Sequence, residues 1–257
     1  MSKLPPKPFN WPLVIFGIVV FLTIICLVYL QLPFGELLRS GENITEYLSR
    51  YTRPDFSELP KYLWLMLVTV IIAFWGTVLS LTLSFFLAPI GAKNLSPHPF
   101  IYRIVRELLN FFRAMPDLVL ALIFVAALGL GPLPGFLALG IHTTGFLGKF
   151  LAESMERVDK GIYEGVSATG TNTLQLIMYA AWPSILQEVI GYTLYIFDRN
   201  VRMATVLGLV GAVGIGVELN TTLRFFNYDK SATLILIILI TIIAIDYLST
   251  WLRKQVL

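Results

Sequence analysis

The chain alternates between long apolar runs and short polar segments. No Asp, Glu, Lys or Arg occurs in residues 11–35, 62–92 or 118–148. An α-helix of about 20 apolar residues crosses the hydrocarbon core of a bilayer, so each run is long enough to span a membrane. The pattern therefore predicts an all-α polytopic membrane protein.

Six helices are expected from this pattern, with approximate ranges of residues 11–32, 61–88, 100–130, 136–155, 182–213 and 232–251. Pro116 is expected to kink the third helix, and GPLPG at residues 131–135 to form a tight turn. The polar segment 36–60 is expected to be a loop or a surface helix. We therefore divide the chain into residues 1–60, one helix with an external polar loop, and residues 61–257, the membrane core.

The composition supports a location in lipid, because 56% of the residues are hydrophobic and only 14% are charged, unlike a water-soluble domain. A single cysteine, Cys26, permits neither a disulfide within the chain nor a Cys-based metal site. The two histidines, His98 and His142, have no partners at metal-ligand spacing. We expect no metal or cofactor in this chain.

The orientation is predicted by the bias of basic residues toward one side of the membrane. The six helices place nine of them on that side: Lys3, Lys7, Lys93, Arg103, Arg106, Arg157, Lys160, Arg253 and Lys254. Both termini are therefore expected in the cytoplasm.

Charged residues interrupt the apolar fifth helix at YIFDRNVRMATVLG, residues 195–208. At ~100° per residue, its polar positions share one face: Gln187, Glu188, Gly191, Tyr195, Asp198, Arg199, Arg202 and Thr205. Asp198 and Arg202 are four residues apart and can pair, which lowers the cost of a charge in lipid. Arg199 is then a surplus cation, and Asn200 is the polar exception on the other side. This face either lines a translocation path or locks the helix to a neighbour by an ion pair.

The third helix carries a second polar face, made of Arg103, Arg106, Asn110 and Arg113 and leading to Asp117. We expect its first arginines to reach the lipid headgroups. Arg113 and Asp117 flank Pro116, near the start of an uncharged run. They are expected either to line the inner end of a pore or to form an ion pair at the membrane interface.

The polar segment between the fourth and fifth helices, at about residues 157–183, contains EGVSATGTNTLQLIMYAAWP. It resembles the EAA loop of ABC importer permeases, which reads E-A-A, three residues, Gly, nine residues, Ile-x-Leu-Pro. Glu164, Gly170 and Pro183 match that pattern. Gly165 stands where the first alanine is expected, and three other positions also depart from the pattern: Val166, Ala180 and Trp182.

Three further stretches extend the resemblance: RAMPDLVLALIFVAALGLGP, GFLGKFLAESMERVDKGIYEGVSATG and NVRMATVLGLVGAVGIGVEL. Together they are similar to the permease of phosphonate- or phosphite-type ABC importers, from about Tyr62 to the C-terminus. The resemblance implies a homodimeric pore in a bacterial inner membrane, a cytoplasmic ATPase dimer that binds ATP and Mg, and an external substrate-binding protein. It implies no nucleic-acid partner.

The resemblance to the EAA loop and the two charged helix faces lead to hypotheses about particular residues. The coupling loop that transmits ATP hydrolysis would contain Glu164, Gly165, Gly170 and Pro183. The path of a small phosphorus oxyanion would be lined by Arg113, Asp117, Asp198, Arg199 and Arg202, because guanidinium groups match such oxygens. The chain is not expected to be an enzyme, since no Gly-rich phosphate loop ending in Gly-Lys-Ser/Thr occurs.

Two other functions compete with this interpretation. A membrane-embedded lipid-headgroup enzyme would use Asp117, His142 and Asp198, but the sequence shows no nucleophile with a base or metal pair. An ion-driven secondary carrier would load a proton or cation at Asp198, but the inverted repeat common in that class is not visible. Co-purification with an ATPase subunit distinguishes the importer from both.

Overall fold

The computed structural model describes residues 10–30, 41–211 and 214–256, and the chain forms two compact units, residues 1–50 and 51–257. In the first unit, α1 (Trp11–Tyr29) is a helix of 19 residues without a charge. The polar segment that follows, for which we expected either a loop or a surface helix, contains a short helix, α3 (Gly41–Ser49). The predicted boundary at residues 60 and 61 stays a prediction.

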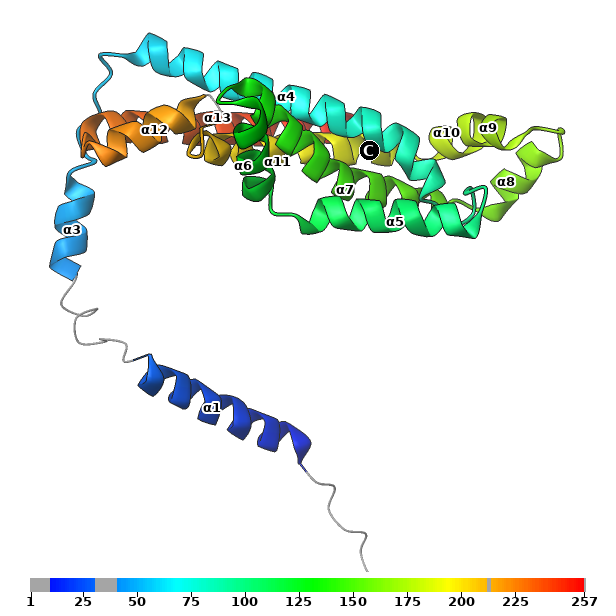
Figure 1. Cartoon of the computed structure of the whole chain (residues 1–257), viewed down its shortest axis with the longest axis horizontal. Coiled ribbons are helices and arrows are strands. Elements are labelled where there is room, and N and C mark those ends of the chain that lie inside the picture. Colours follow the sequence, from blue (N-terminus) through cyan, green and yellow to red (C-terminus); the bar gives the residue numbers. More distant parts are fainter. Residues whose placement is uncertain (1–9, 31–40, 212–213, 257) are drawn as a thin grey trace, which may run out of the picture. The chain divides into compact units, whose positions relative to one another are not determined.

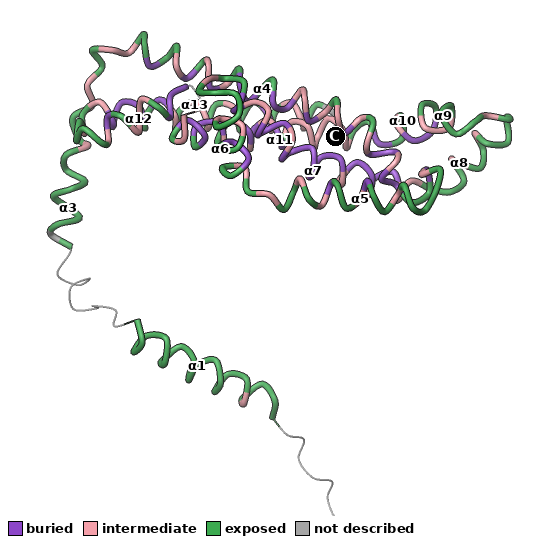
Figure 2. Tube along the Cα trace, viewed as in Figure 1, coloured by how far each residue is buried: buried purple, intermediate pink, exposed green. Residues whose placement is uncertain are grey.

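The second unit is a bundle of long helices (Figure 1). Its core pair is α4 (Leu59–Ile90) and α7 (Pro132–Arg157), which run side by side in the same direction. Glycines allow their close approach. A Cβ on Gly140 would lie 2.9 Å from Cγ of Leu79, and a Cβ on Gly76 would lie 3.0 Å from Cβ of Leu139. Buried residues follow the middle of the bundle (Figure 2).

The third predicted helix is broken into α5 (Pro99–Ala114) and α6 (Asp117–Leu128), whose axes meet at 89°. The kink predicted at Pro116 is therefore a sharp bend. Proline has no backbone N–H to continue the helical hydrogen bonds, and it holds the residue before it in an extended conformation. Met115 has that conformation, with ψ of 124°.

The tight turn expected at residues 131–135 lies earlier in the chain. The backbone reverses at Gly129 and Gly131, which have positive φ angles of 85° and 157°. Pro132 is already the first residue of α7. Its missing N–H does not disturb a first helical turn, whose N–H groups have no helical partner.

The polar segment after α7 has two arms. One is α8 (Lys160–Ser167), and the other consists of α9 (Thr173–Leu176), a π-helical turn at Ile177–Ala181 and α10 (Trp182–Ser184). These arms lie at one end of the bundle, opposite α12 (Figure 1). The fifth predicted helix is interrupted at Ile185, after Pro183, and begins again as α11.

The chain then continues through α11 (Leu186–Gly208), α12 (Ile215–Arg224) and α13 (Tyr228–Val256). Gly208, at the end of α11, packs against the backbone of Gly216 in α12, so these two glycines permit close packing of the two helices. In the described residues, four helices are long and apolar enough to cross a membrane, or five if α5 and α6 count as one span. The fifth predicted helix, α11, is not among them: it has the length but carries four charged residues.

An ion cluster joins α12 and α13 to the start of α4. Lys61 Nζ lies 3.0 Å from Glu58 Oε2 and 2.7 Å from Glu218 Oε1, and Lys230 pairs with the other oxygen of Glu58. We call these four residues the Glu58 cluster. The hydrogen bonds from Lys230 and Lys61 hold the pKa of Glu58 below its ordinary value. The cluster lies at the end of the bundle opposite α8 (Figure 1).

Candidate functional site

A polar seam runs between α5 and α7, which lie antiparallel. At one end, Arg106 contacts Glu156 at 2.9 Å and Glu153 at 3.4 Å, so it is ion-paired with α7. That the first arginines of this face reach the lipid headgroups stays a prediction. One turn further, Lys149 Nζ donates to Asn110 Oδ1 at 3.1 Å. The polar face predicted on the third helix therefore packs along α7.

Arg113 is the next member of this face, and a glycine of α7 determines its position. A Cβ on Gly145 would lie 2.5 Å from the backbone nitrogen of Arg113 and 2.7 Å from the carbonyl oxygen of Leu109. Only a residue without a side chain permits this approach. The close contact places the Arg113 side chain beside Phe146.

Two guanidinium groups share the aromatic ring of Phe146. The Cζ atom of Arg113 lies 4.8 Å from the ring centroid, and that of Arg199, on α11, lies 4.5 Å from it. A cation over an aromatic face is attracted by the electrons of the ring. In the described part of the chain, neither arginine forms a salt bridge with a carboxylate. We call Arg113, Phe146 and Arg199 the arginine pair site.

His142 connects Arg199 to the bend between α5 and α6. Its Nε2 lies 3.0 Å from Nη2 of Arg199, and its Nδ1 lies 2.8 Å from the carbonyl oxygen of Met115. Arginine can only donate and a carbonyl can only accept. These partners therefore assign a neutral imidazole that accepts at Nε2 and donates from Nδ1–H.

Asp198 and Arg202 form the ion pair that their spacing predicted. The carboxylate is buried, with 6% of the side chain exposed, whereas Arg202 is about half exposed, at 45%. Oδ1 of Asp198 and Nη1 of Arg199 are both buried without a hydrogen-bond partner. Asn200 faces α4, where its Nδ2 donates to Thr77 Oγ1 at 3.0 Å.

Asp117 is not paired with Arg113. It begins α6, where its carboxylate accepts a hydrogen bond from the backbone N–H of Leu118 at 3.1 Å. Its side chain is only partly buried. Within the described residues, no salt bridge joins the two groups, so the ion pair considered from the sequence is absent.

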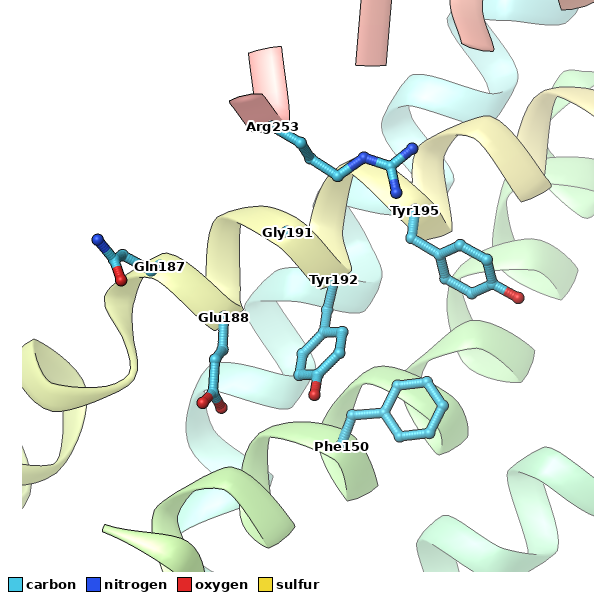
Figure 3. A pocket seen from close by; sticks show the side chains of 7 residues that line it. All are labelled: Phe150, Gln187, Glu188, Gly191, Tyr192, Tyr195 and Arg253. Atoms are coloured by element: carbon cyan, nitrogen blue, oxygen red, sulfur yellow. The ribbon is translucent and has the colours of Figure 1, made fainter. Parts of the chain in front are cut away.

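The polar face of α11 continues into an open pocket of about 440 Å³. Its lining residues are Phe150, Gln187, Glu188, Gly191, Tyr192, Tyr195 and Arg253. The rings of Tyr192 and Phe150, on α11 and α7, face each other at 5.3 Å between centroids (Figure 3). Four members of the predicted polar face therefore line a cavity.

The segment that resembles the coupling loop is a helix, a turn and a second helix. Glu164 and Gly165 lie on the exposed surface of α8, and Pro183 is exposed in α10. Gly170 turns the chain between the two arms with a φ of +80°, which favours glycine. Asn172 and Gln175 form a capping box that starts the second arm.

Two aromatic residues attach this segment to the bundle. The hydroxyl of Tyr163 donates to the carbonyl oxygen of Met155 at 2.9 Å, and burial raises the pKa of Tyr163. Trp182 stacks on Phe85 of α4 at 4.6 Å between ring centroids. The tryptophan that replaces the expected leucine therefore supplies a contact with the membrane core.

Sequence reasoning missed the contribution of α7. Phe146 and Lys149 were not recognised, and His142 was considered only for a rival enzymatic function. A signal was present, because five residues that form the seam recur on α7 at steps of four, three, four and three: His142, Phe146, Lys149, Glu153 and Glu156. Such spacing marks one face of a helix. No group of three metal-ligating side chains occurs in the part of the chain that the structure describes.

Residues 80–257 match the family model described as the binding-protein-dependent transport system inner membrane component. The chain belongs to this family. It is thus a permease subunit of an ABC importer, an inner-membrane transport component and not an enzyme.

Named relatives agree with this assignment. The phosphite transport system permease protein PtxC of Stutzerimonas stutzeri is 35% identical over 242 residues, which cover 94% of this chain and 87% of that protein. The phosphate-import permease protein PhnE of Mycolicibacterium smegmatis is 38% identical over 208 residues, 80% of this chain but only 39% of the relative.

The fold is also that of a known importer. The methionine ABC transporter MetNI, in an inward-facing conformation, has a chain that superposes with a TM-score of 0.65 at 19% identity, covering 77% of this chain and 96% of that chain. The prediction of an all-α ABC permease fold is thereby confirmed.

Proposed function

We propose that this permease subunit carries a small phosphorus oxyanion, such as phosphite or a phosphonate, into a bacterial cytoplasm. One observation carries the proposal: the guanidinium carbons of Arg113 and Arg199 lie within 5 Å of the centroid of one ring, and neither group has a carboxylate partner in the described residues. Guanidinium groups bind such oxygens with charge and with paired donors. The names of the phosphite- and phosphate-transporting relatives support the same class of substrate.

The substrate path in this proposal follows the polar face of α11. Arg199 and Arg202 supply positive charge, and Asp198 anchors Arg202. Arg113 and Asp117 belong to the same path where α5 breaks before α6. The pocket beside Glu188 then continues it toward the coupling segment. A membrane interior with surplus positive charge favours an anion over a cation.

The partners follow from the family and from the shape of the coupling segment. A substrate-binding protein delivers the oxyanion, and an ATPase dimer with ATP and Mg drives its release. A second copy of this chain completes the pore as a homodimer. The exposed arms around Gly170 dock on the ATPase, and the residues in contact are Glu164, Gly165, Gly170 and Pro183.

The end of the bundle that carries the coupling segment is cytoplasmic in this proposal, and both termini lie on that side. Basic residues at that end support this orientation. Lys93 is next to Glu156, whose carboxylate accepts from the Lys93 backbone N–H, and Arg253 lines the pocket at the start of α11. Excess Lys and Arg are typical of cytoplasmic segments.

Reconstitution in liposomes tests the function. The chain is purified with its ATPase and binding protein, and uptake of phosphite and methylphosphonate is measured. We expect ATP-dependent uptake that requires all three proteins, and no hydrolysis of ATP by the permease alone. ATP-dependent uptake of neither oxyanion, or uptake driven by an ion gradient without the ATPase, would contradict the proposal.

Two glycines with left-handed backbones test the coupling segment. Gly170→Ala and Gly129→Ala each introduce a side chain at a positive φ, a strain of about 1–3 kcal/mol. Neither new Cβ would meet another atom within 4 Å. We expect only Gly170→Ala to weaken assembly with the ATPase, as measured by co-purification. Equal losses in both variants would assign the effect to folding.

A further inference from the structure

The arginine pair site joins three helices through one ring. Arg113 comes from α5, Phe146 from α7 and Arg199 from α11, and both guanidinium carbons lie within 5 Å of the ring centroid. Two cations at one ring repel each other. Each is held there by the ring, and the described residues provide no salt bridge for either.

The donors of Arg199 are only partly used. Nη2 lies 3.0 Å from the imidazole of His142, but Nη1 is buried and has no partner. Buried polar groups in proteins are almost always hydrogen-bonded. A charged donor without an acceptor is unfavourable in a membrane, and an anion that accepts a hydrogen bond from it removes this cost.

The remaining partners fix the position of Arg199. His142 accepts from Arg199 and donates to the carbonyl oxygen of Met115, at the bend between α5 and α6. Thr143 and Thr144 next to it bond to their own helix, so they do not compete for the imidazole. The guanidinium plane is therefore set by a ring on one side and by an imidazole at one edge.

We infer that Arg113, Phe146 and Arg199 form an anion-binding site inside the permease, with His142 as a positioning residue. The site takes a small tetrahedral oxyanion, because a guanidinium group can donate to two oxygens of one centre and the buried Nη1 of Arg199 still lacks an acceptor. This inference rests on the proposed function. It adds that the permease itself binds the substrate, in addition to the external binding protein.

Direct binding to the permease–ATPase complex, purified without the binding protein, tests this site. Phosphite and methylphosphonate are titrated by calorimetry, with glucose as an uncharged probe. We expect both anions to bind and glucose not to bind. Arg199→Gln and Phe146→Leu are each expected to weaken anion binding about tenfold or more, because a charge-assisted contact or its support is lost.

A second phenylalanine on α7 supplies the matched control. Phe136 packs against the hydrophobic core, and no arginine lies over its ring in the described residues. Phe136→Leu removes a ring of the same size, so it should leave the affinity for phosphite unchanged. Equal affinity in the wild-type, Arg199→Gln and Phe146→Leu complexes would overturn the site, as would the absence of binding to the wild-type complex.

Two substitutions of His142 separate positioning from packing. In His142→Gln an amide oxygen can replace Nε2 as the acceptor from Arg199, whereas His142→Leu removes it. We expect the Gln variant to bind phosphite within about threefold of the wild type and the Leu variant to lose about tenfold. Equal affinities in the two variants would reject the positioning role. Uptake that persists while binding is unchanged in all variants overturns only this inference, whereas a wild-type system without uptake overturns the proposed function.

Discussion

The Glu58 cluster and the arginine pair site both join three helices through charged side chains, but their charges are balanced differently. In the Glu58 cluster, Lys61 contacts Glu58 and Glu218, and Lys230 contacts Glu58. Two cations meet two anions, so no charge is left over. Lys61, Glu218 and Lys230 belong to α4, α12 and α13, so the cluster links these three helices.

In the arginine pair site, two cations meet a ring and a neutral imidazole. No carboxylate neutralises them in the described residues, and Nη1 of Arg199 has no acceptor. Charged residues that only link helices are expected to pair with each other, because a buried unpaired charge destabilises the fold. The comparison therefore separates charges that hold the bundle together from charges that are suited to bind a ligand.

The largest expected effect comes from Arg199→Gln. If Arg199 contacts the substrate, phosphite uptake in liposomes should fall about a hundredfold, because a charge-assisted hydrogen bond to the substrate is lost. The yield of assembled complex should stay close to that of the wild type. Lys61→Gln is the matched control from the Glu58 cluster, and it should lower thermal stability slightly while uptake per assembled complex is kept.

The opposite result would reverse the comparison. Near-normal uptake in Arg199→Gln, together with a loss of complex yield, would show that Arg199 serves helix packing and not transport. Loss of uptake in assembled Lys61→Gln complexes would place the Glu58 cluster on the transport path.

The intermediate effect concerns the ion pair next to the arginine pair site. Arg202→Gln leaves the carboxylate of Asp198 buried and unpaired. Breaking a fully buried pair costs about 3–5 kcal/mol. Because Arg202 is about half exposed, we expect a smaller loss, seen as a lower melting temperature and a lower complex yield. The double variant with Asp198→Asn removes both charges and should recover the yield but not the uptake. Recovery of both would assign the pair a purely structural role.

The sequence predicted most of the fold because helix length and apolar character are local properties. The positions of five of the six predicted helices agree with the structure to within a few residues. The bend at Pro116 was predicted by the special backbone of proline. The earlier turn at Gly129 was missed, because Pro132 suits the first turn of a helix as well as it suits a loop.

The arginine pair site was only half predictable. Helical spacing showed that Asp198 and Arg202 pair and that Arg199 lies on a polar face. It did not show which helix that face meets, because contacts between helices depend on packing over long sequence distances. The approach of α5 to α7 at Gly145 decides that Arg113 and Arg199 share one ring. A single sequence contains no direct signal of such a contact.

The smallest expected effect is the pH dependence of the Glu58 cluster. Because Lys230 and Lys61 donate to Glu58, its pKa in the folded protein lies below the value of about 4.3 expected for an unfolded chain. A carboxyl with a lowered pKa stabilises the fold above the unfolded pKa, and this contribution is lost as the pH falls through the folded pKa. Glu58→Gln should therefore melt slightly below the wild type at pH 7, as measured by intrinsic fluorescence in detergent, and the difference should shrink as the pH falls below about 4.3. Arg199 forms no salt bridge with a carboxylate in the described residues. The difference in melting temperature between Arg199→Gln and the wild type should therefore not follow the same pH course. A difference in melting temperature between Glu58→Gln and the wild type that persists or grows on acidification would show that the charge of Glu58 does not stabilise the cluster. The contrast between the two sites would then be supported only by the behaviour of Arg199.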